Sequence, residues 1–294
     1  MDWERVLEKL DRILDRVEQL VPQKPEAPDW KKAIAYRWRR RSNGGFLQPV
    51  RSPHNIRLSD LQGVDDQKRL VEQNTRQFVE GFTANNVVLT GAKGTGKSSL
   101  VKAILNKFAS RGLRMIEVEK HDLLDLPDIV DLVEAAPYQF IIFCDDLSFD
   151  AEEPGYKALK VVLDGSISAT SDNVLIYATS NRRHLMPEYM QENLETKYLG
   201  EEIHPGESVE EKISLSERFG LWVSFYPFDQ DEYLTIVYYW LEKLAKTSVN
   251  KGAVRQDALQ WALLRGSRSG RVAWQFARDW VGRQHVAELA HKRT

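Results

Sequence analysis

The sequence contains very little cysteine and no long apolar run. Cys144 is the single cysteine among 294 residues, so no disulfide can form within the chain, and a reducing, cytoplasmic setting is expected. No apolar run approaches the roughly 20 residues needed to span a bilayer. The charged N-terminal stretch also lacks the apolar segment of a signal peptide. These absences predict a cytoplasmic protein without a membrane partner.

The chain also has almost no net charge, but its charges are segregated. The formal net charge of -2 taken alone argues against nucleic-acid binding. However, Lys31 to Ser59 contains eight basic residues and no acidic one, whereas Glu188 to Glu211 contains eight glutamates and a single lysine. The positions of the charges along the chain are therefore a better guide to partners than the net charge. Apolar residues make up 42% and charged residues 29%, which is typical of a globular protein.

Four segments are predicted along the chain. An apolar stripe at steps of three and four predicts an amphipathic helix over 1–21, and a proline linker with a basic arm follows over 22–57. Alternating helices and continuous apolar strands over 58–228 predict an α/β core, with a doubly wound parallel sheet covered on both faces. Residues 229–294 contain helical patterns without strands, which predicts a small helical lid.

The strongest motif is GAKGTGKS, which matches GxxxxGK[ST] and lies between a predicted strand and a predicted helix. Its glycines let backbone N–H groups wrap phosphates, while Lys97 reaches the β and γ phosphates and the Ser98 hydroxyl binds Mg²⁺. The alternative is a chance glycine-rich turn. This P-loop predicts ATP and Mg²⁺ as cofactors, bound by Gly91, Gly94, Thr95, Gly96, Lys97, Ser98 and Ser99.

Two adjacent carboxylates end the apolar strand FIIFC, 48 residues after Lys97. The carboxyl ends of parallel strands face the ligand crevice. We therefore expect Asp145 to hold Mg²⁺ together with Ser98, and Asp146 to polarise the attacking water. The alternative is a solvated turn. Asn181 ends the strand NVLIYATS and is placed to orient water or to touch the γ phosphate, or else to cap the following segment.

Two arginines are the remaining candidate catalytic residues. Arg218 lies just before the last predicted strand, and in a ring it would enter a neighbour's nucleotide site as an arginine finger. An intramolecular salt bridge is the alternative. Arg271 follows Gly270 at the start of the last helix, where it would touch the γ phosphate. Arg268 is the competing candidate for this contact. The alternative is that the arginine only lies on the surface of a basic helix.

These motifs, in this order, resemble those of the AAA+ ATPases. GAKGTGKS looks like Walker A, FIIFCDD like Walker B, Asn181 like sensor 1, Arg218 like the arginine finger and Gly270-Arg271 like sensor 2. The resemblance extends from about Leu58 to the C-terminus. It implies an ATP hydrolase that works as an oligomer, in a ring or filament, on a macromolecular partner.

The same resemblance also concerns the residues that bind the adenine base and the rate of ATP hydrolysis. LSDLQGVDDQKRLV resembles the adenine-pocket segment of the superfamily, with Leu61, Gly63 and Val64 lining the base. ANNVVLTGAKGTGKSSLVKA and HPGESVEEKISLSERFGLW look like a bacterial AAA+ family catalogued as domain of unknown function 815. Most AAA+ motors carry Asp-Glu in Walker B, whereas this chain carries Asp-Asp. The shorter second carboxylate favours slow turnover, as in a nucleotide switch, and a non-hydrolysing ATP-dependent scaffold is the alternative function.

Three segments suggest partners. The helix over 1–21 is a candidate recruiter of a protein client. In 31–59, arginines can neutralise phosphates while Trp38 or Tyr36 stacks on bases, which makes nucleic acid a candidate partner. The alternative is a basic face docked on an acidic partner or on the ATPase body. The glutamate-rich span 188–211 is a solvated acidic loop, or else a segment that meets the basic arm in the same subunit or the next.

Overall fold

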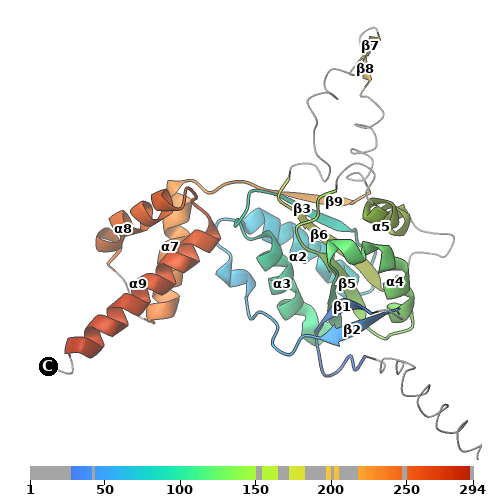
Figure 1. Ribbon diagram of the computed structural model, residues 1–294, viewed down its shortest axis with the longest axis horizontal. Helices are drawn as coiled ribbons and strands as arrows, with labels where there is room; N and C mark the ends of the chain where they lie inside the picture. The colour runs from blue at the N-terminus through green and yellow to red at the C-terminus, as the bar shows by residue number, and fades with distance from the viewer. Residues whose placement is uncertain are drawn as a thin grey trace, which may run out of the picture.

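The computed structural model describes residues 28–41, 44–149, 154–164, 172–182, 197–199, 202–204, 218–246 and 250–291. A central sheet carries helices on both faces, and a group of three helices lies beside it (Figure 1). The helix expected over 1–21 and most of the glutamate-rich span 188–211 lie outside the described residues.

Seven strands form the central sheet, in the order β2-β1-β4-β5-β6-β3-β9. All neighbouring strands pair in parallel except β1 and β2, which form an antiparallel hairpin at one edge. β7 (Lys197–Leu199) and β8 (Glu202–His204) pair separately. The strands of the central sheet are β1 (Ala35–Arg41), β2 (Gly44–Pro49), β3 (Val87–Gly91), β4 (Leu113–Glu117), β5 (Gln139–Cys144), β6 (Val174–Ser180) and β9 (Leu221–Phe225).

Helices follow most of the parallel strands, as the sequence predicts, so the doubly wound α/β core is confirmed. The helices of the core are α2 (Asp65–Val79), α3 (Lys97–Phe108), α4 (Leu126–Glu134) and α5 (Pro154–Asp164), and the short 3-10 turns are η1 (Leu58–Asp60), η2 (Ala109–Arg111) and η3 (Lys120–Asp125).

Each strand of the core contributes to two apolar layers, because successive side chains point to opposite faces. In β5, Ile141 and Phe143 join the layer under α2 and α3, while Phe140 and Ile142 join the layer under η3, α4 and α5. Burial on both faces explains why these strands read as continuous apolar runs. Cys144 lies in the second layer and is 1% exposed, as expected for a small apolar residue.

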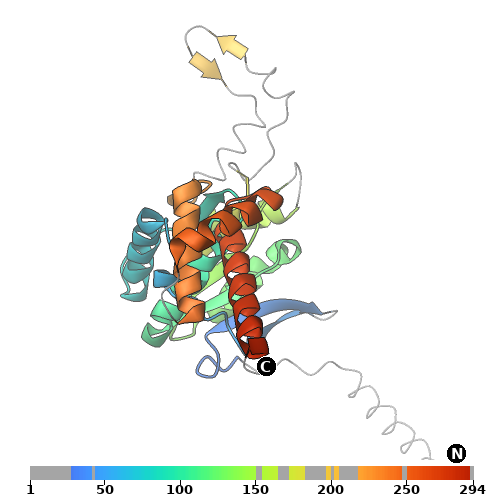
Figure 2. The same ribbon diagram turned by 90° about the vertical axis from the view of Figure 1, so that its left-hand side faces the viewer.

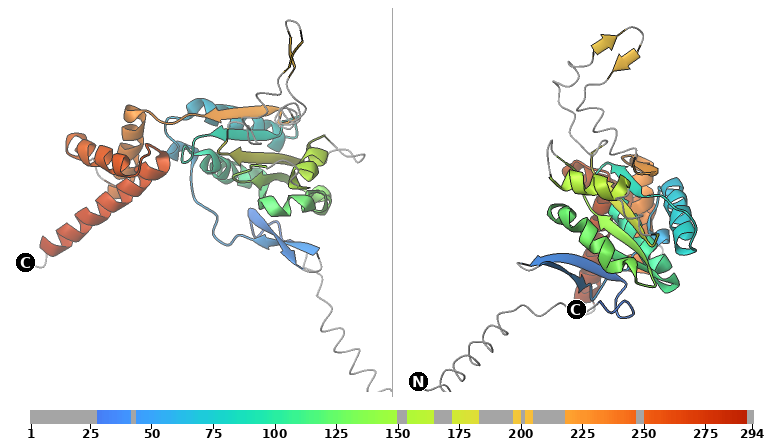
Figure 3. Two further views of the ribbon diagram at one scale, coloured as in Figure 1. Left: turned by 45° about the horizontal axis from the view of Figure 1, so that its top comes forward. Right: turned by 90° about the vertical axis from the view of Figure 1, so that its right-hand side faces the viewer.

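The lid consists of α7 (Gln230–Ala245), α8 (Lys251–Leu264) and α9 (Gly270–His291). α7 begins with a capping box, in which Asp229 and Glu232 each accept the other's backbone N–H. α7 and α9 pack along each other (Figure 2), and the C-terminal end of α9 points away from the sheet (Figure 3). The predicted helical lid is confirmed. No described helix is long and apolar enough to cross a bilayer.

The basic segment before residue 58 differs from the arm that its composition suggests, because it adds two strands to the central sheet. β1 lies parallel to β4, so two of its arginines meet the acidic residues at the end of that strand. Arg37 donates to Glu117 at 2.6 Å, and Arg39 donates to Glu119 at 2.7 Å. The basic segment is thus docked on the body of the protein, which is one of the readings that its sequence leaves open.

The expectation that Trp38 or Tyr36 stacks on bases is wrong. Alternation along β1 turns both rings inward, and they are 3% and 1% exposed. The Trp38 indole donates to the buried Asp125 at 2.9 Å, and Arg40 binds the same carboxylate. Gly45 is required opposite the indole, since a Cβ there would lie 1.8 Å from the ring. Neither aromatic ring is available to a nucleic acid.

Replacing Trp38 by alanine is expected to lower the free energy of unfolding by about 3–5 kcal/mol, because it empties a buried site and leaves Asp125 short of a donor. Urea denaturation followed by circular dichroism measures this loss. Phe82→Ala is the control, since Phe82 is 66% exposed and its removal should change stability by less than about 0.5 kcal/mol. Equal stabilities for the two variants would contradict the burial of Trp38.

Candidate functional site

The loop between β3 and α3 is built from glycines in left-handed backbone conformations. Gly91, Gly94 and Gly96 have φ values of 126°, 78° and 107°, which side chains with a Cβ rarely adopt. A Cβ at Gly91 would also lie 1.9 Å from the carbonyl oxygen of Phe225, on the neighbouring strand. The loop therefore runs close to β9 and ends directly at the N-terminus of α3, where backbone N–H groups and the helix dipole favour an anion.

Lys97, the first residue of α3, points back across this loop. Its Nζ donates to the carbonyl oxygens of Gly91 and Ala92 at 2.8 and 2.7 Å, and to Asn181 Oδ1 at 3.1 Å. The side chain is buried, and burial lowers the pKa of Lys97, although the nearby Asp146 acts in the opposite direction. A partly desolvated ammonium group in a glycine loop is well suited to bind a phosphate.

Ser98 and Asp145 come together at the carboxyl edge of the sheet. The Ser98 hydroxyl donates to Asp145 Oδ1 at 2.5 Å, and the Thr179 hydroxyl donates to the same oxygen at 2.6 Å. A serine hydroxyl beside a carboxylate is a set of hard oxygen donors, which is what Mg²⁺ prefers. These residues therefore fit the ion that the sequence predicts.

Asn181 links the lysine to the second carboxylate. Its Nδ2 donates to Asp146 Oδ1, while its Oδ1 accepts from Lys97. Asp146 has a φ of 54°, so its backbone is left-handed although it is not glycine. Such strain is found at functional sites and costs about 1–3 kcal/mol. The five predicted residues around the loop thus form two hydrogen-bonded sets, Ser98 with Asp145 and Lys97 with Asn181 and Asp146, which the Thr179 hydroxyl joins.

The lid reaches this group through the start of α9. A Cβ on Gly94 would lie 2.8 Å from Ser269 Oγ and 3.5 Å from Arg271 Cβ, so the tip of the loop touches the residues that begin α9. Ser269 is buried and caps that helix by accepting the N–H of Val272 at 3.3 Å. Of the two arginines that compete for the sensor role, Arg271 is therefore packed near the loop tip, and it also acts on the pKa of Lys97.

The segment predicted to line the adenine base lies on the other side of the loop. Leu61 and Val64 are buried. A Cβ on Gly96 would lie 3.7 Å from Leu61 Cδ2, and a Cβ on Gly63 would lie 3.2 Å from the Phe228 ring. Phe228 precedes α7, so it joins the core, the base segment and the lid. It has no motif of its own in the sequence, and only its position in the structure marks it as a candidate.

A second contact fastens the lid beside the base segment. Asp60 is buried and receives hydrogen bonds from Lys243 and from Tyr239, the latter at 2.5 Å. Burial alone raises the pKa of Asp60, but the hydrogen bonds from Lys243, Tyr239 and the Arg57 N–H outweigh it and hold the pKa below its ordinary value. Asp60, which directly precedes Leu61, is thus bonded to α7. These bonds connect the segment predicted to line the base with the lid.

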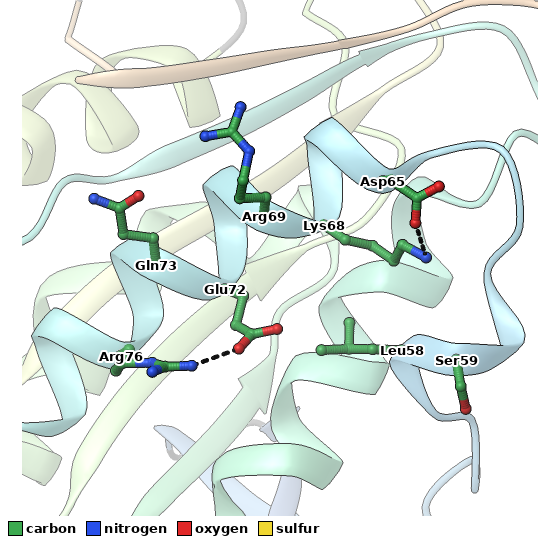
Figure 4. Close-up of a pocket in the computed structure, with 8 residues that line it drawn as sticks. All are labelled: Leu58, Ser59, Asp65, Lys68, Arg69, Glu72, Gln73 and Arg76. Atoms are coloured by element: carbon green, nitrogen blue, oxygen red, sulfur yellow. Dashed lines mark hydrogen bonds and ion pairs between the residues drawn. The ribbon is translucent and has the colours of Figure 1, made fainter.

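A wide groove of about 1140 Å³ lies between the glycine loop and α8 of the lid. Its walls include Lys93 and Thr95 from the loop, Arg268 from the segment before α9 and Arg255 from α8. The described residues that line it include no acidic one, which favours an anionic ligand. A smaller groove of about 550 Å³ follows the exposed face of α2 (Figure 4). There Lys68 pairs with Asp65 and Arg76 pairs with Glu72, so that groove offers paired charges.

Arg218 forms an ion pair within its own chain. Its guanidinium pairs with Asp164, the last residue of α5 in the same chain. This contact is the intramolecular salt bridge that its sequence position left open as an alternative.

Thr179 is the site residue that sequence reasoning missed. It is next to last in β6, two positions before Asn181, and its hydroxyl reaches both members of the Asp145-Asp146 pair. The alternation of β6 could have revealed it, because residues two apart in a strand share a face.

Comparison with known proteins gives one family and several similar structures. The model of a family described as "Protein of unknown function (DUF815)" matches residues 31–284. No curated protein matches the chain. The Thermotoga maritima RuvB Holliday junction branch migration motor is 17% identical with a TM-score of 0.45, and two variants of it are 15% and 14% identical with TM-scores of 0.47. Each match covers 76% of this chain and 63% of the RuvB chain.

Proposed function

Since the chain belongs to the DUF815 family and has an AAA+ P-loop fold, we propose that it binds ATP with Mg²⁺ and hydrolyses it. The observation that carries the proposal is that Lys97, Ser98, Asp145, Asp146 and Asn181 lie beside the glycine loop in two hydrogen-bonded sets, joined by the Thr179 hydroxyl. These residues come from three parts of the chain, yet they meet at the N-terminus of one helix, where phosphates bind.

Each member of the group has a separate part in the proposed reaction. Lys97 and the loop N–H groups bind the β and γ phosphates, and Ser98 with Asp145 holds the cation. Bound Mg²⁺ supplies neutralisation of the charge that develops on the phosphate oxygens. Asp146, oriented by Asn181, polarises the attacking water.

The proposed turnover is slow. The Asp146 carboxylate is one methylene shorter than the glutamate found in fast motors, and one of its oxygens is held by Asn181. A carboxylate held in this way reaches a water less readily than a longer, freer one. We therefore propose a nucleotide switch that changes state on hydrolysis.

We also propose how the protein assembles and which partner it binds. We propose that the protein self-associates and that Arg218 acts in a neighbouring subunit's site. Recruitment of a protein client through 1–21 is the partner reading we favour, because burial of Tyr36 and Trp38 removes the main support for nucleic acid at 31–59.

Asp146→Asn tests hydrolysis directly. The amide keeps the size of the side chain but cannot accept a proton, so kcat should fall by about 100-fold or more, as for the loss of a general base. The affinity for ATP should stay within about threefold of the wild type, because the phosphates bind elsewhere. Phosphate release assays and isothermal titration with MgATP measure the two quantities.

Asp131→Asn is the matched control, since Asp131 is an exposed aspartate on α4. It should leave both quantities unchanged. If the wild type binds MgATP but hydrolyses it no faster than Asp146→Asn does, the protein is a non-hydrolysing scaffold instead.

A further inference from the structure

Thr179 occupies a central position at the carboxyl edge of the sheet, although the motifs assign it no role. It is next to last in β6, and it is 2% exposed. β6 pairs in parallel with β5, and Cys144 lies opposite Ala178. Thr179 is therefore level with Asp145, the residue that follows β5, and its side chain is within reach of both carboxylate residues.

The Thr179 hydroxyl makes two hydrogen bonds to two different residues. Its Oγ1 donates to Asp145 Oδ1 at 2.6 Å and accepts the backbone N–H of Asp146 at 3.0 Å. The Leu147 N–H also donates to the Thr179 carbonyl oxygen at 2.6 Å. A hydroxyl has a single proton, so donation to Asp145 fixes which lone pair faces Asp146. One side chain thus sets the geometry of the whole Asp145-Asp146 pair.

The effect on Asp145 is to fix the plane of its carboxylate. Oδ1 receives hydrogen bonds from both Ser98 and Thr179. Both donors are held by regular elements, since Ser98 is in α3 and Thr179 is in β6. An outer hydrogen bond of this kind orients a metal-binding carboxylate, and its loss typically costs about 10–100-fold in metal affinity or activity.

The effect on Asp146 is to hold its backbone in a strained turn. Aspartate tolerates a left-handed φ of 54° better than most residues, but the conformation still needs support from its surroundings. The hydrogen bond from the Asp146 N–H to Thr179 supplies that support. In this conformation the Asp146 carboxylate meets the Asn181 amide.

We propose that Thr179 is a positioning residue that aligns Asp145 for the cation and Asp146 for the attacking water through one hydroxyl. The proposal rests on the ATPase function proposed above. It assigns Thr179 no contact with the nucleotide, because its proton is given to Asp145 and its burial keeps it below the surface of the site.

Thr179→Val tests the proposal, because valine has nearly the same shape but neither donates nor accepts a hydrogen bond. We expect the Mg²⁺ concentration for half-maximal ATPase to rise by about 10-fold and kcat to fall by about 10–100-fold. Isothermal titration should give an unchanged ATP affinity in EDTA, while the gain in affinity on adding Mg²⁺ should shrink. Thr179→Ser restores the hydroxyl and should return all values to within about threefold of the wild type.

Thr75→Val is the control for a lost buried hydroxyl. Thr75 is fully buried in α2, and its Oγ1 bonds Val71 O and the Tyr177 hydroxyl, each at 2.7 Å. It should lower stability without changing the Mg²⁺ dependence. Thermal unfolding of all three variants identifies any that fails to fold.

Two results would overturn the positioning role. The first is a Thr179→Val protein with wild-type Mg²⁺ dependence and kcat. The second is a loss of ATP affinity in EDTA that Thr179→Ser does not restore, which would show a purely structural role. A wild-type protein without ATPase activity would instead refute the proposed function, and the binding titrations with and without Mg²⁺ would still test Thr179.

Discussion

Replacing Lys97 by alanine is expected to lower the ATPase rate by about 1,000-fold or more, the largest effect that we predict for this chain. The Lys97 side chain is buried, and its ammonium lies inside the loop, within hydrogen-bond distance of Gly91, Ala92 and Asn181. A cation in such a setting interacts strongly with phosphate, because little water screens it. Alanine removes this charge and leaves Asn181 without one of its partners.

The measurement combines steady-state phosphate release with MgATP titration. Lys107→Ala is the control, since Lys107 lies on the same helix but is exposed and pairs with Glu72 at 2.7 Å. It should retain the wild-type rate. Thermal unfolding of Lys97→Ala should show a folded protein, because the loop and the strand beside it are held by backbone contacts. Unchanged hydrolysis in a folded Lys97→Ala protein would remove the P-loop assignment.

Replacing Arg218 by alanine is expected to keep ATP binding and to lower kcat by about 1,000-fold, which is the size of an arginine-finger effect. In the structure the Arg218 guanidinium pairs with Asp164 within the same chain. For the finger to reach a neighbouring subunit, it must exchange this carboxylate for the charge that develops on the transferring phosphate. The loss should therefore appear in kcat and not in the affinity for ATP.

Mixing two inactive variants decides where Arg218 acts. Arg218→Ala supplies an intact nucleotide site, and Lys97→Ala supplies an intact arginine, so an assembly of both should recover part of the wild-type rate if the finger acts in trans. Arg69→Ala is the control, because Arg69 forms an exposed ion pair with Asp66 and should show the wild-type rate. A mixture that stays inactive, although both variants assemble, would make the role of Arg218 intramolecular.

Much of the candidate site follows from the sequence because its parts are local. The loop between β3 and α3 is recognisable from eight consecutive residues, since the glycines, Lys97 and Ser98 must be adjacent to wrap a phosphate. The ends of β5 and β6 are recognisable because a buried parallel strand is a continuous apolar run, and polar residues begin where the strand leaves the core. Alignment of those ends at one edge then brings Asp145 and Asn181 to the loop.

The partners of the basic segment could not be read from the sequence, because they lie far along the chain. Arg37 and Arg39 meet carboxylates that lie 80 positions later in the chain, and Arg40 meets Asp125 85 positions later. No local pattern encodes such pairings. Composition showed the excess of positive charge, but only the parallel pairing of β1 with β4 revealed what neutralises it.

The sequence by itself determined the P-loop, the alternating core, the helical lid and the residues that end the central strands, because each depends on neighbours within a few positions. Only the tertiary structure decided that Trp38 and Tyr36 are buried, that Thr179 holds both aspartates and that the start of α9 touches Gly94. These features depend on which strands pair and how the lid packs. Such contacts arise from burial and hydrogen bonding between residues far apart in the chain.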